Sequence, residues 1–118
     1  MKLFVPGRIC LFGEHSDWAG GYRRINADIE KGLAIIAGTN QGLHAEVKPH
    51  PTKLIVRATL DDGTRKGPYE VPMDAAALLE AAESGGFFSY AAGVAYQVLT
   101  HYRVRGLEID NDQTDLPV

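Results

Sequence analysis

Residues 3–14 form a mostly apolar run that predicts a β-strand, in which successive side chains point to opposite faces. One face carries the odd-numbered residues Leu3, Val5, Ile9 and Leu11, and the other carries Phe4, Arg8, Cys10, Phe12 and Glu14. Both faces are mostly apolar, which predicts a strand that is covered on both sides. In such a strand we expect Cys10 to be a buried, reduced thiol and Arg8 to need an anionic partner.

The rest of the first half of the chain is rich in extended patterns and turn residues. We expect strands over 24–36, 43–47 and 54–60, and turns at Gly42, 49–51 and 61–63. Strands that follow one another through short turns predict an antiparallel meander across the first sixty residues. Arg65 and Lys66, which follow the last of these turns, are interpreted as solvated loop charges.

The period changes to three and four residues in the second half of the chain. Asp74 is a good N-cap for a helix over 75–83, and Gly85–Gly86 is a good stop. Apolar residues at helical spacing predict a longer helix over 87–102, and Leu107 and Ile109 predict a last short strand. Strands first and helices afterwards predict one α+β domain over residues 1–118, an antiparallel or mixed sheet with the helices on one face.

Composition narrows the classes of function. The chain has 118 residues, 45% of them hydrophobic and 23% charged, which is ordinary for a globular domain. A net charge of −3 gives no basic surface for nucleic acid or an anionic membrane. No apolar run has membrane-spanning length and the first residues do not form a signal peptide, so we expect a cytoplasmic protein without membrane or nucleic-acid partners.

Side chains capable of chemistry are concentrated where the first strand ends. Gly13 permits a turn, so that the next residues project from the end of the sheet, and Gly20 and Gly21 predict a second turn where backbone can approach a ligand. Between these turns lie three hydrogen-bonding side chains, Glu14, His15 and Asp17. Ionised carboxylates accept hydrogen bonds from vicinal hydroxyl groups, so the loop predicts a binding site for a polyol.

Other interpretations of the same residues stay open. Glu14, His15 and Asp17 are also typical of a solvated polar turn, and two carboxylates with a histidine can hold a metal ion when other segments add ligands. Arg8 could stabilise a transferring phosphoryl group or simply pair with a buried acid. Six residues of straight strand would separate Arg8 from Glu14 by roughly 20 Å, so both belong to one site only if Gly7 or Gly13 bends the chain.

The run from Pro6 to Gly21, PGRICLFGEHSDWAGG, resembles the first signature of the galactokinase branch of the GHMP small-molecule kinases, usually written P-G-R-x-N-L-I-G-E-H-T-D-Y-x-x-G. This sequence has Cys10 where that branch commonly has asparagine, and Trp18 where it commonly has tyrosine. The resemblance implies a partial N-terminal GHMP kinase-like domain over residues 1–118. It also implies that Arg8 is catalytic and that the loop residues Glu14, His15, Asp17, Gly20 and Gly21 bind a monosaccharide.

The resemblance further implies ATP and Mg²⁺ as cofactors of a complete sugar kinase. In the family a phosphate loop follows the opening section, and residues 115–118 resemble the approach to that loop. We therefore expect the 118 residues alone to bind no cofactor, to be inactive as a kinase, and to self-associate through uncovered apolar surface. The alternative is a noncatalytic sugar-binding or regulatory relative that keeps the acidic loop.

Overall fold

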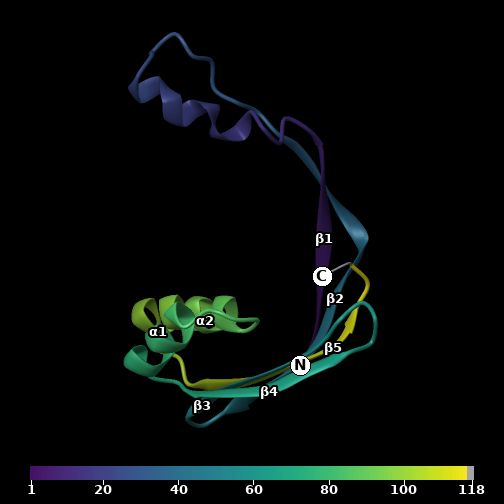
Figure 1. The fold of residues 1–118 in the computed structure, drawn as a ribbon. Coiled ribbons are helices and arrows are strands. Elements are labelled where there is room, and N and C mark those ends of the chain that lie inside the picture. The colour runs from purple at the N-terminus through teal and green to yellow at the C-terminus, as the bar shows by residue number, and fades with distance from the viewer. Residues whose placement is uncertain (117–118) are drawn as a thin grey trace. The chain divides into compact units, whose positions relative to one another are not determined.

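The computed structural model describes residues 1–116, with the backbone alone at Asp17. Two compact units make up the chain: residues 1–5 with 43–118, here called the sheet unit, and residues 6–42, here called the loop unit. The elements, in chain order, are β1 (Lys2–Phe12), a 3-10 helix (Asp17–Arg24), β2 (Ile35–His50), β3 (Lys53–Thr59), β4 (Arg65–Pro72), α1 (Ala75–Glu83), α2 (Ser89–His101) and β5 (Gly106–Thr114) (Figure 1). The protein is thus an α+β protein with a mixed five-stranded sheet and two helices.

The strand order β1-β2-β5-β3-β4 shows that the predicted meander is wrong. The last strand, β5, lies between β2 and β3, antiparallel to the first and parallel to the second. A parallel pair needs a long crossover, and the hairpin partner β4 followed by α1 and α2 supplies it. The meander placed β2 beside β3 because the two strands are adjacent in sequence. The insertion of β5 between them depends on contacts between residues far apart in sequence, which local patterns do not reveal.

The predictions for residues 24–36 and for Gly42 are also wrong, except that Ile35 and Ile36 do lie in a strand, at the start of β2. Over residues 24–34 the chain instead completes the 3-10 helix and forms an irregular segment, in which the Asp28 N–H donates to Asn26 Oδ1 at 3.0 Å. Such an Asx turn competes with extended pairing. At Gly42, β2 continues without a turn, since Gly42 does not have the positive φ that a two-residue hairpin loop requires.

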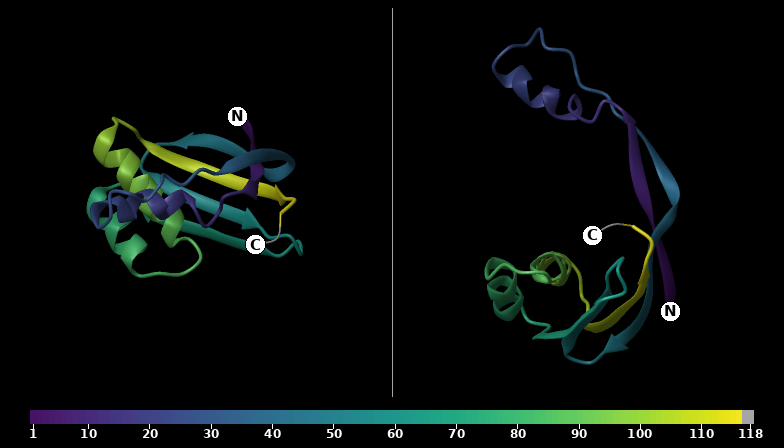
Figure 2. Two further views of the ribbon diagram at one scale, coloured as in Figure 1. Left: turned by 90° about the horizontal axis from the view of Figure 1, so that it is seen from above. Right: turned by 45° about the vertical axis from the view of Figure 1, so that its right-hand side comes forward.

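The core of the sheet unit lies between the helices and one face of the sheet. Figure 2 shows both helices on the same face, as the sequence predicted. Asp74 accepts hydrogen bonds from the Ala76 and Ala77 N–H groups at 3.1 Å and so begins α1 as an N-cap. The core itself consists of Leu54, Val56, Val71, Leu78 and Ala95. Leu78 is fully buried at 0% exposure, so α1 is held mainly by this side chain.

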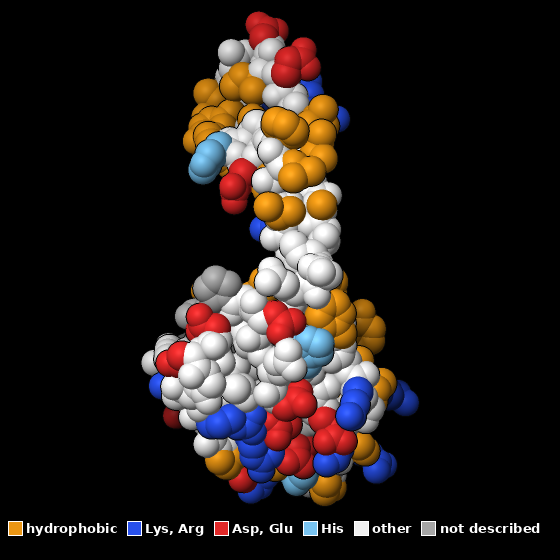
Figure 3. Space-filling model, turned by 90° about the vertical axis from the view of Figure 1, so that its right-hand side faces the viewer, with side chains coloured by type: hydrophobic (Ala, Val, Ile, Leu, Met, Phe, Trp, Pro, Cys, Tyr) orange, Lys and Arg blue, Asp and Glu red, His pale blue; other side chains and the backbone are white. Residues whose placement is uncertain are grey.

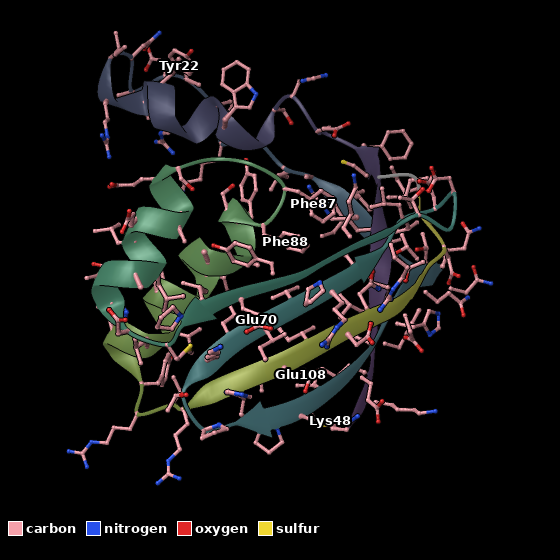
Figure 4. The ribbon with its side chains drawn as sticks, turned by 60° about the horizontal axis from the view of Figure 1, so that its bottom comes forward. Tyr22, Lys48, Glu70, Phe87, Phe88 and Glu108 are labelled. Atoms are coloured by element: carbon pink, nitrogen blue, oxygen red, sulfur yellow. The ribbon has the colours of Figure 1, made fainter. Side chains whose placement is uncertain are left out.

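Ion pairs join the strands of the sheet unit, two of them between neighbours and one from β4 to β5 across β3. The pairs are Lys53–Glu70 at 2.9 Å, Arg65–Asp110 at 2.7 Å, and Arg57–Glu108. Figure 3 shows acidic and basic side chains mixed over one side of this unit, and Figure 4 shows that Glu70 and Glu108 come from neighbouring regions of the sheet. The interpretation of Arg65 as a loop charge is therefore wrong, because it begins β4 and pairs across the sheet. The hydrogen bond from Lys53 lowers the pKa of Glu70, and the hydrogen bond to Glu108 raises the pKa of Arg57.

The first strand exists, but the prediction that it is covered on both faces is wrong. In the sheet unit, Met1 and Val47 exchange two backbone hydrogen bonds, of 2.7 and 2.8 Å. In the loop unit, Ile9 and Phe12 are 52% and 72% exposed, and Cys10 is a half-exposed free thiol. A strand pair, one 3-10 helix and an irregular segment contain too little chain to cover both faces of this strand.

Candidate functional site

The turn at Gly13 ends β1 and opens the loop that the sequence singled out. Gly13 has a φ of +87°, as the sequence analysis required of a turn at this position. A Cβ built on Gly13 would lie 1.9 Å from the Leu33 carbonyl oxygen. Only glycine therefore lets the chain turn here while the segment that enters β2 passes beside it.

Ser16 closes this turn. Its backbone N–H donates to the Gly13 carbonyl oxygen at 3.0 Å, and its hydroxyl lies 3.0 Å from the carbonyl oxygens of both Gly13 and Leu33. The single hydroxyl proton of Ser16 is thus shared between the carbonyl oxygens of Gly13 and Leu33. The geometry of residues 13–16 is fixed by this hydrogen bonding, not by side-chain burial.

The predicted second turn at Gly20 and Gly21 is wrong, because both glycines lie inside the 3-10 helix with ordinary φ values. Trp18 and Tyr22 contact edge to face on this helix, with ring centroids 5.3 Å apart. A Cβ at either glycine would have no heavy atom within 4 Å. The backbone at these glycines is consequently open to close approach, although the turn that was expected to provide the opening does not form.

Glu14 and His15 lie in the turn between β1 and the 3-10 helix, and both are exposed. Neither forms an ion pair with a side chain that the structure describes. Their polar side-chain atoms are therefore accessible to the hydroxyl groups of a ligand. The side chain of Asp17 lies outside the described part of the chain, so its role in sugar binding stays a prediction.

Arg8 is exposed on β1 and forms no ion pair with a described side chain, so the structure does not support its interpretation as the partner of a buried acid. The strand runs unbroken from Lys2 to Phe12, and Gly7 does not have a positive φ. Four residues of strand separate Arg8 from Phe12 by about 13 Å. The structure bends the chain at Gly13 but not at Gly7, and it does not bring Arg8 into contact with Glu14.

Among the described side chains, no three histidine, cysteine, aspartate or glutamate residues gather as metal ligands would. The described residues therefore do not present a carboxylate set that fits magnesium. Residues 117–118, part of the predicted approach to a phosphate loop, lie outside the described part of the chain.

Sequence reasoning missed a cavity of about 450 Å³ in the sheet unit. It lies between α2 and the sheet, and its lining includes Met73, Tyr90, Val94, Val98, Leu107 and Ile109. These residues form no sequence motif. The only signal in the sequence is that α2 has more apolar positions than are needed to pack against the core. The cavity lining is mostly apolar, with Arg105 and Tyr90 as its polar members, in contrast to the exposed acidic loop.

No protein-family model matches this sequence, and a search of curated proteins found no significant match. Within residues 1–116, no helix has the length and apolar character to cross a membrane.

Proposed function

We propose that the chain is the N-terminal portion of an ATP-dependent sugar kinase that transfers the γ-phosphate to a monosaccharide hydroxyl group. The observation that carries this proposal is the loop after β1, where Gly13 and Ser16 fix a turn that presents Glu14 and His15 to solvent. The same residues form the stretch that resembles the galactokinase-like signature. A GHMP kinase-like fold for the complete enzyme is part of the proposal.

Glu14 would accept hydrogen bonds from two neighbouring hydroxyl groups of the sugar, and His15 would add a donor or an acceptor. Hydrogen bonds to a charged acceptor contribute about 1.5–3 kcal/mol each, which is enough to select a hydroxyl pattern. Arg8 would act on the transferring phosphoryl group. ATP and Mg²⁺ supply the phosphoryl group and charge neutralisation in such a reaction, and none of the described residues is assigned to hold them.

A second candidate function is that of a noncatalytic sugar-binding protein. The observation that favours it is the separation along β1 between Arg8 and the loop, with no bend at Gly7. A group that acts on a phosphate must lie within a few ångströms of the hydroxyl group that attacks it. If Arg8 stays far from the sugar, the loop binds without catalysing.

Sugar binding is tested by saturation-transfer NMR on the chain with galactose, glucose and mannose. We expect at least one hexose to bind, and Glu14→Gln to weaken its binding by roughly tenfold or more because the amide loses the charged acceptor. Glu30→Gln is the matched control, since Glu30 is an exposed acid of the same unit outside the signature. Equal losses in both variants, or no hexose bound at all, would remove the loop as a sugar site.

Coupled ADP release separates the two candidate functions. A complete enzyme that contains this chain should release ADP in a sugar-dependent manner, and Arg8→Ala should lower turnover by about 10²-fold with little change in sugar affinity. Sugar binding without any ADP release from the complete protein would favour the noncatalytic function. The 118 residues alone are expected to release none.

A further inference from the structure

One face of α2 is apolar and exposed. Its residues recur every four positions and are Tyr90, Val94 and Val98 in the helix and Tyr102, the extended C-cap residue that follows it, with exposed fractions of 86%, 64%, 36% and 69%. Ala92 lies on the other side of the helix and is buried in the sheet unit, and Ala95, also buried, borders the stripe. Over Ser89–His101 the helix contains no aspartate, glutamate, lysine or arginine. A surface helix normally carries charges on its outer face, so this stripe is unusual for a face that remains in water.

The stripe is symmetric about its own centre. Reading outward from Tyr96, valine occurs two residues away in both directions, and tyrosine occurs six residues away in both directions. A two-fold axis through this point would place Val94 of one copy against Val98 of the other, and Tyr90 against Tyr102. Isologous contacts require this self-complementarity, in which residue i meets residue j and residue j meets residue i.

The exposed area is large enough for a dimer. Multiplied by the full surface areas of tyrosine and valine, the exposed fractions of the four stripe residues give an accessible area of about 500 Å² per copy. Two copies would bury about 1,000 Å², which is the lower limit of a specific interface. Phe87, just before α2, is a further exposed apolar side chain, with an exposed fraction of 54%. The apolar cavity of about 450 Å³ shares Tyr90, Val94 and Val98 with the stripe, so there is space beside α2 for side chains of a second copy.

The free edge of the sheet at β4 is a poor alternative interface. It contains two prolines, Pro68 and Pro72, and begins with two cations, Arg65 and Lys66. Proline cannot donate a ladder hydrogen bond, and like charges on paired edges repel each other. We propose that two copies of this chain associate through α2, with the helices antiparallel and the stripe Tyr90–Val94–Val98–Tyr102 at the centre of the interface.

Sedimentation equilibrium tests the surface. The unmodified chain should dimerise, and Val94→Glu should raise the dissociation constant at least 100-fold, because it places two carboxylates in an apolar contact. Ile9→Glu is the matched control, since Ile9 is a 52% exposed apolar residue on β1, in the loop unit, and is not part of the stripe. The control should leave the dimer intact. A chain that is monomeric at every concentration, or a dimer that Ile9→Glu disrupts and Val94→Glu does not, would overturn the proposal.

Disulfide trapping tests the orientation with variants that keep the stripe uncharged. In a Cys10→Ser background, the Tyr90→Cys chain mixed with the Tyr102→Cys chain should form a mixed disulfide dimer. The Tyr90→Cys chain alone should not cross-link, because in the antiparallel arrangement the two copies of position 90 lie near opposite ends of the paired helices, about 18 Å apart at 1.5 Å per residue. Cross-linking of Tyr90→Cys with itself, and none in the mixture, would overturn the antiparallel arrangement. Circular dichroism at 222 nm confirms that each variant is folded before it is scored.

Discussion

Replacing Gly13 by alanine should destabilise the turn that presents Glu14 and His15. An alanine with a φ of +87° costs about 1–2 kcal/mol. The new Cβ would lie 1.9 Å from the Leu33 carbonyl oxygen, so Leu33 must move away, and the hydrogen bond from Ser16 to Leu33 is lost with it. That hydrogen bond contributes about 0.5–1.5 kcal/mol. The loop unit should therefore lose about 1.5–3.5 kcal/mol of stability.

Urea titration followed by tryptophan fluorescence measures this loss, because Trp18 is the single tryptophan and lies in the loop unit. Gly20→Ala is the matched control, since Gly20 has an ordinary φ and open space where the Cβ would lie. At such a site alanine leaves stability unchanged or raises it by about 0.4–1 kcal/mol. Equal midpoints for the two variants would refute the reasoning. Circular dichroism at 222 nm, which reports mainly on α1 and α2, should not change in either variant.

Three further predictions concern the sheet unit. Leu78→Ala should cost about 2–5 kcal/mol, measured by urea unfolding at 222 nm, because it removes a fully buried side chain from the core. Asp74→Ala should cost about 1 kcal/mol in the same assay through loss of the N-cap. Lys53 lowers the pKa of Glu70 below its ordinary 4.5, so this carboxylate contributes stability above that pH and loses it as the pH falls through the lowered pKa. Glu70→Gln should therefore show a smaller fall in Tm between about pH 5 and pH 3 than the unmodified chain.

Local signals in the sequence predicted the parts of the fold that depend on neighbouring residues. Asp74 followed by an alanine-rich run predicted α1 over 75–83, with the bounds that the structure has. Gly13 predicted a turn because a positive φ is a property of one residue and its nearest neighbours. The longer helix and the last strand were predicted for the same reason, although β5 runs several residues further than its apolar pair indicated.

Nonlocal pairing explains most of what the sequence did not predict. β4 has no clean alternation, with Gly67 and Pro68 at its centre, and it is a strand because β3 pairs with it from Lys53↔Pro72 to Thr59↔Arg65. The position of β5 between β2 and β3 depends on two pairings far apart in sequence. Exposure of β1 in the loop unit could not be predicted either, since an apolar strand does not specify which segment covers it. At the candidate site, the sequence predicted the turn and the exposed acid but not the 3-10 helix through Gly20 and Gly21.

The candidate loop is held by hydrogen bonds and one glycine, because every large apolar side chain described in the loop unit is at least partly exposed. Regions with few buried apolar contacts open at low free energy, so ligand binding and local stability must be coupled in this unit. A ligand that binds only the closed turn stabilises it by about 2.7 kcal/mol at 100 times its dissociation constant. A hexose that occupies the loop should therefore raise the Trp18 unfolding midpoint and offset much of the Gly13→Ala loss. The same hexose should leave the 222 nm transition of α1 and α2 unchanged. A midpoint that shifts equally at both signals would mean that the sugar acts on the whole chain as a solvent additive and not at this loop.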